Sequence, residues 1–344
     1  MAEKKLHAIM IAFSFQGHIT PFINLALKLA SNGCTITFLH TEFVHRMLSK
    51  AHHSVEEVDL FSGERKFNLD IRYMTIYDSF PPNYDRILNF NEYWETILRD
   101  FPSRVDELVG KLIVQSDDDE ALVFSIDYHL DLLIEKGYFP SRGVQSIKSK
   151  DLMSYLQDVE ITTIHQIVTK AFEQVKSADF ILINTVDELE HETIQALNQK
   201  QPTYAIGPIN VSTNFTTTVV PKSLWSETDC TEWLNSKPSD SVLYVSFGSL
   251  AQSNKQLVEE IAYGLLLCEK KFIWVLRENT DVLPDRLKNS LRDKGLFVSW
   301  CNQNEVAEKI KELMSGENLL NGLRNEIKKI RSVVHKALAK DGST

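Results

Sequence analysis

The regular alternation of short apolar stretches with amphipathic ones is the feature that most constrains how this chain can fold. Residues 7–15 form a mostly apolar stretch typical of a buried strand, and residues 35–39 form another. Between them, apolar residues recur at helical spacing over 22–29, after Thr20 and Pro21, which suit a helix cap and a first helical position. Strand, turn, helix and strand in this order open a βαβ unit, so an α/β protein with parallel sheets is predicted.

The same alternation continues on both sides of a polar linker. Gly33 lies where the first helix should end, because glycine readily adopts the left-handed conformation that closes a helix. Residues 210–221 are rich in Thr, Ser and Asn and lack periodicity. We therefore expect an N-terminal domain at 1–209, a linker at 210–228 and a C-terminal domain at 229–344. In the N-terminal domain the expected strands are 71–76, 180–185 and 204–206, and the expected helices are 89–115, 161–178 and 186–199.

The alternation stops early in the C-terminal domain. Strands are expected at 242–247, 272–276 and 296–299, and over 304–340 the pattern is helical only. A nucleotide-binding sheet of the doubly wound type normally has about six strands. The second domain is therefore predicted to be truncated to about three strands followed by C-terminal helices.

The composition excludes several classes of function. The net charge is -10 and no basic stripe occurs, so no nucleic-acid partner is expected. No apolar run reaches the roughly 18 residues of a membrane-spanning helix, so no membrane span is expected. The four cysteines form no CxxC pair and no disulfide-dense pattern. We expect a cytoplasmic monomer without a metal site.

His18 is the strongest candidate for a catalytic residue. It lies where the first strand gives way to the first helix, and ligands bind at this end of open parallel sheets. A neutral imidazole there could accept a proton from a substrate hydroxyl near pH 7. A histidine that only caps the turn fits the same position.

Two segments of the C-terminal domain could contact a nucleotide. Residues 242–249, Val-Leu-Tyr-Val-Ser-Phe-Gly-Ser, run from a strand into a small-residue loop that could hold a phosphate or form an ordinary turn. Trp300, at the end of another strand, could stack on a base or pack in the core. Neither a Walker motif nor the dinucleotide fingerprint occurs, so ATP and NAD are not expected.

Taken together and in this order, the motifs resemble the family 1 UDP-glycosyltransferases of plants. The shared motifs are strand-Gln-Gly-His-x-x-Pro-helix, Val-Leu-Tyr-Val-Ser-Phe-Gly-Ser, Phe-Ile-Trp-Val-Leu-Arg and Trp-Cys-x-Gln, with Tyr-Ala-Ile-Gly-Pro before the linker. They extend over most of the chain. The resemblance implies a fold of the GT-B type, in which two Rossmann-like domains face each other. The first would bind mainly the acceptor and the second mainly the UDP-sugar.

The resemblance also implies roles for particular residues. His18 corresponds to the general base, which deprotonates an acceptor hydroxyl so that it attacks the sugar with inversion and displaces UDP. Ser249 corresponds to a serine beside the diphosphate, Trp300 to the residue that stacks on uracil, and Gln303 to a glutamine that contacts the nucleotide. The implied partners are a small hydroxylated metabolite and a UDP-sugar co-substrate, with UDP-glucose expected. No metal and no other cofactor is implied.

The chain departs from the family pattern in two places. After Gln303 the long signature box with its Cys-Gly-Trp-Asn run is missing, and residues 304–310 look like the family's late helix. That box holds the diphosphate and the sugar, so its loss predicts low activity. A second segment is missing near residue 120. Residues 121–127 could form the strand whose aspartate, here Asp127, orients the base, but 123–135 also resembles a later helix, which would place Asp127 elsewhere.

Three functions therefore remain open. The chain could transfer a hexose, with glucose expected, to a hydroxyl of a small metabolite. It could be an inactive remnant that at most binds a small molecule, or the incomplete product of a full-length active enzyme. The breaks fall inside motifs and not between domains, which favours the incomplete product over the remnant. A Cys-Gly-Trp-Asn segment between Gln303 and Asn304 in the full transcript would establish it.

Overall fold

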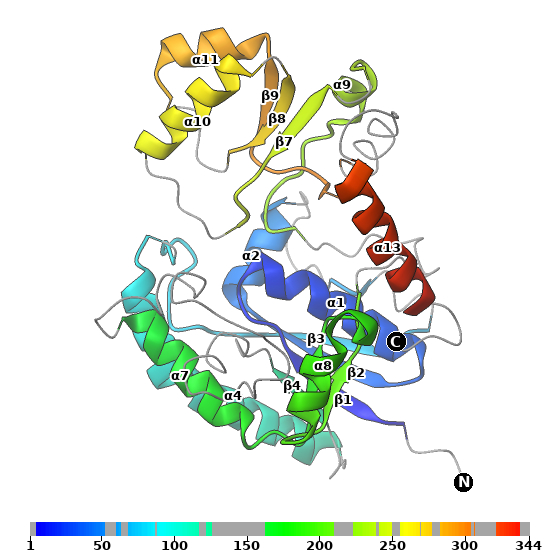
Figure 1. Cartoon of the computed structure of the whole chain (residues 1–344). Coiled ribbons are helices and arrows are strands. Elements are labelled where there is room, and N and C mark those ends of the chain that lie inside the picture. Colours follow the sequence, from blue (N-terminus) through cyan, green and yellow to red (C-terminus); the bar gives the residue numbers. More distant parts are fainter. Residues whose placement is uncertain are drawn as a thin grey trace.

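In the computed structural model, the N-terminal domain is built on a four-stranded parallel sheet (Figure 1). The strands lie in the order β3-β2-β1-β4, with bounds β1 His7–Ile11, β2 Thr35–Thr41, β3 Ile71–Ile76 and β4 Leu122–Ser125. The structure describes residues 5–51, 60–62, 68–86, 88–116, 122–125, 162–209, 223–238, 241–249, 255–268, 270–276, 283–303, 306 and 321–337.

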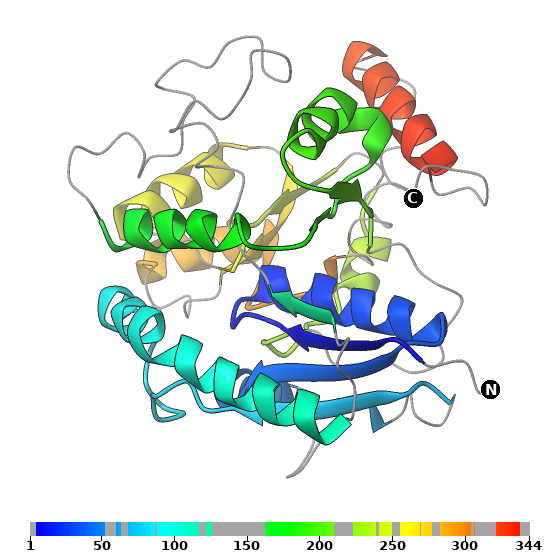
Figure 2. The ribbon, with the colours of Figure 1, turned by 90° about the horizontal axis from the view of Figure 1, so that it is seen from below.

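Helices cover both faces of this sheet, which explains why its inner strands are apolar throughout. Every residue of β2 is buried, as expected for a parallel strand packed on both sides. Helices α1 (Gln16–Ser31) and α2 (Glu42–Ala51) pack on one face, where their apolar side chains join those of β1 and β2 in a single core. Helix α4 (Phe90–Ser116) lies on the other side and contacts α7 (Thr163–Val175) (Figure 2).

The start of α1 differs from the prediction based on Thr20 and Pro21. The helix begins at Gln16, so Pro21 lies inside it and its missing N–H removes one hydrogen bond near the N-terminus. Thr20 does not cap the helix, because it lies inside it and Phe15 is at the N-cap position. The Thr20 hydroxyl instead accepts a hydrogen bond from Gln16 Nε2 at 3.0 Å. His18 is therefore placed in the first turn of α1 and not before it. The predicted end of the helix is confirmed, since Gly33 has a φ of 91°.

The remainder of the N-terminal domain follows the predicted alternation. Strands β5 (Ile181–Ile183) and β6 (Thr203–Ala205) form a separate two-stranded parallel sheet, with α8 (Asp187–Asn198) between them in the chain. Each predicted helix and strand of this domain is found, with ends shifted by a few residues. Pro102 lies inside α4, which remains one helix.

The C-terminal domain contains a three-stranded parallel sheet, which confirms the predicted number of strands in the described part of the chain. Its strand order is β7-β8-β9, and β8 in the middle buries Phe272, Ile273 and Trp274 completely. The elements are α9 Thr231–Asn235, β7 Val242–Val245, α10 Lys255–Leu267, β8 Lys271–Val275, α11 Asp285–Arg292 and β9 Gly295–Val298.

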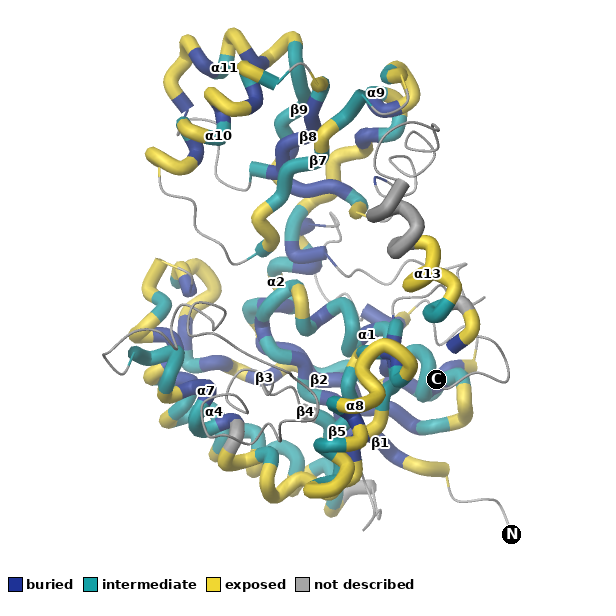
Figure 3. The backbone as a smooth tube through the Cα atoms, viewed as in Figure 1, coloured by how far each residue is buried: buried dark blue, intermediate teal, exposed yellow. Residues whose placement is uncertain are grey.

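The last described helix returns to the N-terminal domain. Helix α13 (Asn321–Ala337) runs from the C-terminal domain and contacts α8 (Figure 1). Burial is concentrated in the inner strands β1, β2 and β8 and in the inner faces of the helices packed on them (Figure 3). No helix among the described ranges is both long and apolar enough to cross a membrane.

One buried histidine makes the stability of the N-terminal core depend on pH. The side chain of His40, near the end of β2, is fully buried, and neither ring nitrogen has a hydrogen-bond partner among the described residues. Its ring packs edge-on against Phe38 and Tyr73, with centroids 4.8 and 5.9 Å away. Burial, with a smaller contribution from the charge of His45, lowers the pKa of His40 to about 3. The folded state therefore holds this imidazole neutral.

Replacing His40 by leucine should reduce the acid sensitivity of the fold. An unfolded histidine has its ordinary pKa of 6.5, so the neutral folded form contributes full stability above that pH and loses it as the pH falls. Denaturant unfolding at pH 7 and pH 5 should show that His40→Leu lessens the loss of unfolding free energy by about 2 kcal/mol. The control is His191→Leu, whose side chain is 55% exposed. Equal pH dependence of His40→Leu and wild type would contradict the assignment.

Candidate functional site

His18 lies in the first turn of α1 with two aromatic rings beside it. The ring centroids of Phe13 and Phe15 are 6.1 and 5.9 Å from that of the imidazole. Both phenylalanines follow directly on β1, so the turn from strand to helix brings the three rings together. Burial lowers the pKa of His18 to about 4. The imidazole is consequently neutral at pH 7 and able to accept a proton.

These rings belong to a larger group of aromatic side chains at the carboxyl ends of β1 and β3. Trp94 of α4 stacks on Phe13 with centroids 5.0 Å apart and an angle of 16°, and it lies 5.9 Å from Phe15. The group packs as one apolar unit and gives His18 its poorly solvated surroundings. We call it the aromatic cluster; its members are Phe13, Phe15, Phe80, Tyr84, Phe90, Tyr93 and Trp94.

The turn that carries His18 is tied to residues 223–228, which we call the connecting segment. Gln16 Oε1 accepts a hydrogen bond from the backbone N–H of Leu224 at 2.8 Å. The Ser226 hydroxyl donates to the carbonyl of Ala51, at the end of α2, at 3.1 Å. Leu224 is buried in the same core as β1 and β2. The connecting segment is therefore part of the N-terminal packing.

Trp225 joins the connecting segment to the C-terminal domain. Its indole stacks on that of Trp300, with ring centroids 4.6 Å apart and an angle of 27°. It packs against the hydrophobic cores of both domains. The N–H of Thr228 also donates to the carbonyl of Trp300 at 2.9 Å, and Thr228 pairs with Cys301 in a parallel bridge. The connecting segment thus binds both the turn that carries His18 and the residue Trp300.

The structure places Trp300 in the core of the C-terminal domain. Its side chain is 6% exposed and packs with Cys230, Leu234 and Val306. Trp225 occupies one face of the indole and core side chains surround the rest, so stacking of Trp300 on uracil stays a prediction.

The other two donor-side residues follow the carboxyl ends of two parallel strands of the same sheet. Ser249 is half-buried after β7, in a loop where Gly248 has a φ of 75° that favours glycine. Gln303 is exposed and comes after β9. Since β7 and β9 are the two edges of the sheet, with β8 between them, Ser249 and Gln303 lie on separate loops.

The proposed partner of the base lies beyond a strand that the structure does describe. Residues 122–125 form β4, which pairs in parallel with β1. The alternative in which a helix begins at residue 123 is therefore wrong for 123–125. Asp127 itself is outside the described residues, so its contact with His18 stays a prediction. Burial lowers the pKa of His18.

The other titratable groups of the described chain form no metal centre. No three His, Cys, Asp or Glu side chains there are arranged to hold a metal ion. Near Trp300, the hydroxyl of Tyr244 lies 3.8 Å from Cys301 Sγ. A hydrogen bond with Cys230 lowers the pKa of the Cys301 thiol to about 7. All four cysteines are free.

Several residues of the site were not identified from the sequence. Trp225 falls in the stretch interpreted as a linker, and the available signal was a tryptophan among Ser, Thr and Asn residues. Phe13 and Phe15 alternate with Ser14, which in a strand would place them on one face. Trp94 comes from a helix far away in sequence, so no local pattern could place it beside His18.

Removing the Trp225 indole should weaken the junction of the two domains. Because Trp225 is half-buried and packs against both cores, Trp225→Ala should lower the unfolding free energy by about 3 kcal/mol, the low end for tryptophan truncation. Trp225→Phe keeps a ring against Trp300 and should cost less. Trp233→Ala is the matched control, since Trp233 is also half-buried but packs against the C-terminal core. Equal losses for Trp225→Ala and Trp233→Ala in calorimetry would contradict a junction role.

Comparisons with known proteins agree on one family. The chain is 43% identical to UDP-glycosyltransferase 86A1 of Arabidopsis thaliana in an alignment that covers 88% of this chain and 72% of that protein. It is 29% identical to (R)-mandelonitrile beta-glucosyltransferase of Prunus dulcis, with 89% of this chain and 75% of that protein covered. No family model matches the chain.

Solved structures show the same architecture. Os79 of O. sativa in complex with UDP has a TM-score of 0.67 and 19% identity, covering 87% of this chain and 74% of Os79. UGT73P12 of Glycyrrhiza uralensis, complexed with glycyrrhetinic acid 3-O-monoglucuronide, has a TM-score of 0.68 and 14% identity, covering 99% and 93%. These likenesses confirm the predicted GT-B fold, and the 43% identity to UDP-glycosyltransferase 86A1 shows the family. This chain belongs to the plant UDP-glycosyltransferases.

Proposed function

We propose that this chain binds a small hydroxylated metabolite beside His18 and that His18 is the base for inverting transfer of glucose from UDP-glucose. The observation that carries the proposal is the neutral, partly buried imidazole at the carboxyl end of β1, flanked by Phe13 and Phe15. Proton removal from the acceptor hydroxyl by the imidazole would generate the nucleophile. The oxygen would then attack the anomeric carbon while the bond to UDP breaks.

His18 is a weak base in the surroundings that the described residues give it. A general base works best when its pKa lies near the operating pH. Burial lowers the pKa of His18 to about 4, so protonation of the imidazole at neutral pH is unfavourable. An ionised carboxylate beside it would raise the pKa and stabilise the imidazolium. Asp127 is the proposed source of such a carboxylate if it reaches His18.

The residues proposed to bind the UDP-sugar are few, and we therefore expect slow transfer of the sugar. We assign Trp300 to the uracil, Ser249 to the diphosphate and Gln303 to the nucleotide. The Cys-Gly-Trp-Asn run that would add diphosphate and sugar contacts does not come after Gln303. Each hydrogen-bond donor that stabilises charge on a leaving group contributes on the order of 3–4 kcal/mol to the transition state. Several such losses would leave acceptor binding as the main surviving function.

A second candidate is that this chain is an incomplete version of an active enzyme. The observation that favours it is the position of the break, directly after the Trp-Cys-x-Gln motif and not between domains. The test is the full transcript: a Cys-Gly-Trp-Asn segment between Gln303 and Asn304 would establish the candidate. A transcript that joins these two codons directly would exclude it.

The cellular compartment and the oligomeric state of the chain are also proposals. Its free cysteines suit a reducing cytoplasm, and we propose that it acts there as a monomer with no metal and no cofactor other than the UDP-sugar co-substrate.

Release of UDP from UDP-glucose, measured with a panel of phenols that includes umbelliferone, tests the role of His18. We expect turnover at least about 100-fold below that of UDP-glycosyltransferase 86A1, the effect of one lost donor. The residual turnover should disappear in His18→Ala. His191→Ala, at an exposed histidine of α8, is the control and should keep wild-type turnover. Turnover that survives in His18→Ala would overturn the assignment of the base.

Titration of His18 by NMR tests whether Asp127 is its partner. Because burial is the cause of the shift, we expect a midpoint near 4. Base-catalysed turnover should then be constant from pH 7 to about pH 5 and fall about tenfold per pH unit below the pKa. Asp127→Asn should leave the midpoint unchanged. A midpoint above 6 that Asp127→Asn lowers would contradict the expectation and show that Asp127 orients the base.

A further inference from the structure

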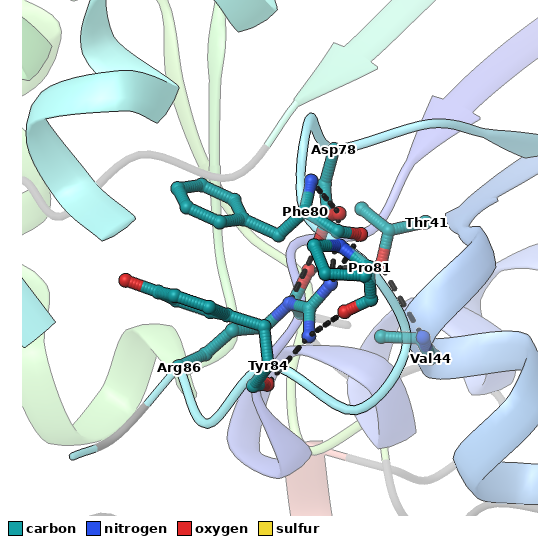
Figure 4. Close-up of polar contacts among 8 residues, drawn as sticks. Thr41, Val44, Asp78, Phe80, Pro81, Tyr84 and Arg86 are labelled. Atoms are coloured by element: carbon teal, nitrogen blue, oxygen red, sulfur yellow. Dashed lines mark hydrogen bonds and ion pairs between the residues drawn. The ribbon is translucent and has the colours of Figure 1, made fainter. Parts of the chain in front are cut away.

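A buried ion pair lies in the loop that comes after β3. The side chains of Arg86 and Asp78 are 3% and 1% exposed. Arg86 Nε donates to Asp78 Oδ2 at 2.7 Å, and Nη2 donates to Asp78 Oδ1 at 2.8 Å (Figure 4). This is the two-point geometry in which a guanidinium matches a carboxylate.

The remaining hydrogen bonds of the pair go to the backbone of the same loop. Arg86 Nη1 donates to the carbonyl of Tyr84 at 2.9 Å and to that of Pro81 at 3.5 Å. Nη2 also donates to the carbonyl of Phe80 at 3.3 Å, and Asp78 Oδ1 accepts from the N–H of Phe80 at 3.2 Å. The pair therefore fixes the path of residues 78–86 from inside the loop (Figure 4).

The backbone of this loop is strained at a residue next to the pair. Ser79 has a φ of 75°, in the left-handed region that residues with a side chain seldom occupy. Such a conformation persists only where the surroundings determine it. The hydrogen bonds of Asp78 and Arg86 on both sides of Ser79 supply that constraint, so the loop is held in one particular shape.

The loop carries part of the aromatic cluster beside His18. Phe80 stacks on Tyr84, with ring centroids 4.4 Å apart and an angle of 28°, and lies 5.5 Å from Tyr93. Tyr93 is next to Trp94, which stacks on Phe13 beside His18. The guanidinium of Arg86 also lies 3.9 Å from the ring centroid of Phe43 on α2. The ion pair thus fixes the positions of two rings of the aromatic cluster, those of Phe80 and Tyr84.

We propose that Asp78 and Arg86 are positioning residues for acceptor binding. They fix Phe80 in the buried part of the aromatic cluster. The partly exposed rings of the cluster next to His18, Phe13 and Phe15, then present a fixed apolar surface to the ring of a hydroxylated aromatic acceptor. The inference rests on the proposed function. Stability alone does not call for a buried ion pair, because well-packed apolar residues in its place are often equally stabilising. The hydrogen bonds to three carbonyls of one loop are what an apolar pair could not supply.

A double substitution separates positioning from stability. Asp78→Leu combined with Arg86→Met removes both charges together, and so leaves no buried charge without a partner. The probe is umbelliferone, a fluorescent hydroxycoumarin, titrated with the full chain. We expect the double variant to keep the thermal midpoint of the wild type within a few degrees and to bind umbelliferone roughly tenfold more weakly, as for the loss of one aligned ring contact. Glu107→Gln combined with Lys111→Met, an exposed pair on α4, is the control and should bind as the wild type does.

The outcomes distinguish the inference from the function on which it rests. If the wild type binds umbelliferone and the folded double variant binds it equally well, the positioning role is wrong and the proposed function stands. If the wild type does not bind umbelliferone, the proposed acceptor site is wrong and the inference falls with it. Should the double variant not fold, Arg86→Lys decides, because an ammonium keeps the charge but cannot reach the carboxylate and three carbonyls at once. Unchanged affinity in Arg86→Lys would overturn the inference.

Discussion

The stack of Trp225 on Trp300 is the contact on which the arrangement of the two domains depends. Each domain has its own parallel sheet and its own core, and Trp225 packs into both. Around it, Gln16 holds the backbone of Leu224, and Thr228 holds the backbone of Trp300. The residue proposed as base and the residue proposed to contact uracil are therefore positioned by the same short connecting segment.

That arrangement was only partly predictable from the sequence. The strands and helices were, because apolar periodicity is a local signal: β2, β3 and α4 begin and end within two residues of their expected bounds. The start of α1 was not, because the helix begins at Gln16, about one turn before Thr20, with no side-chain cap at Phe15 to mark it in the sequence. The number of strands in the C-terminal sheet was predictable directly from where the alternation stops.

The surroundings of His18 could not be predicted for a different reason. Its position at the end of β1 is visible in the sequence, but the shift of its pKa comes from burial among Phe13, Phe15 and Trp94, which separate elements bring together. The Asp78–Arg86 pair is similar. Its two charges are eight residues apart in a proline-containing stretch without periodicity, and only the folded chain shows that both are buried. Tertiary contacts of this kind leave no periodic signal.

In the proposed enzyme, the acceptor side contains the base, His18. The donor side lacks the Cys-Gly-Trp-Asn run, which would bind the diphosphate as it leaves. The most direct test is to insert a signature segment of the family, with its Cys-Gly-Trp-Asn run, between Gln303 and Asn304 and measure turnover with UDP-glucose and umbelliferone. We predict a gain of at least about 100-fold in kcat, the effect of restoring one or more transition-state donors, with the affinity for umbelliferone unchanged. A chimaera that folds and binds umbelliferone but turns over no faster than the present chain would contradict the proposed division of roles.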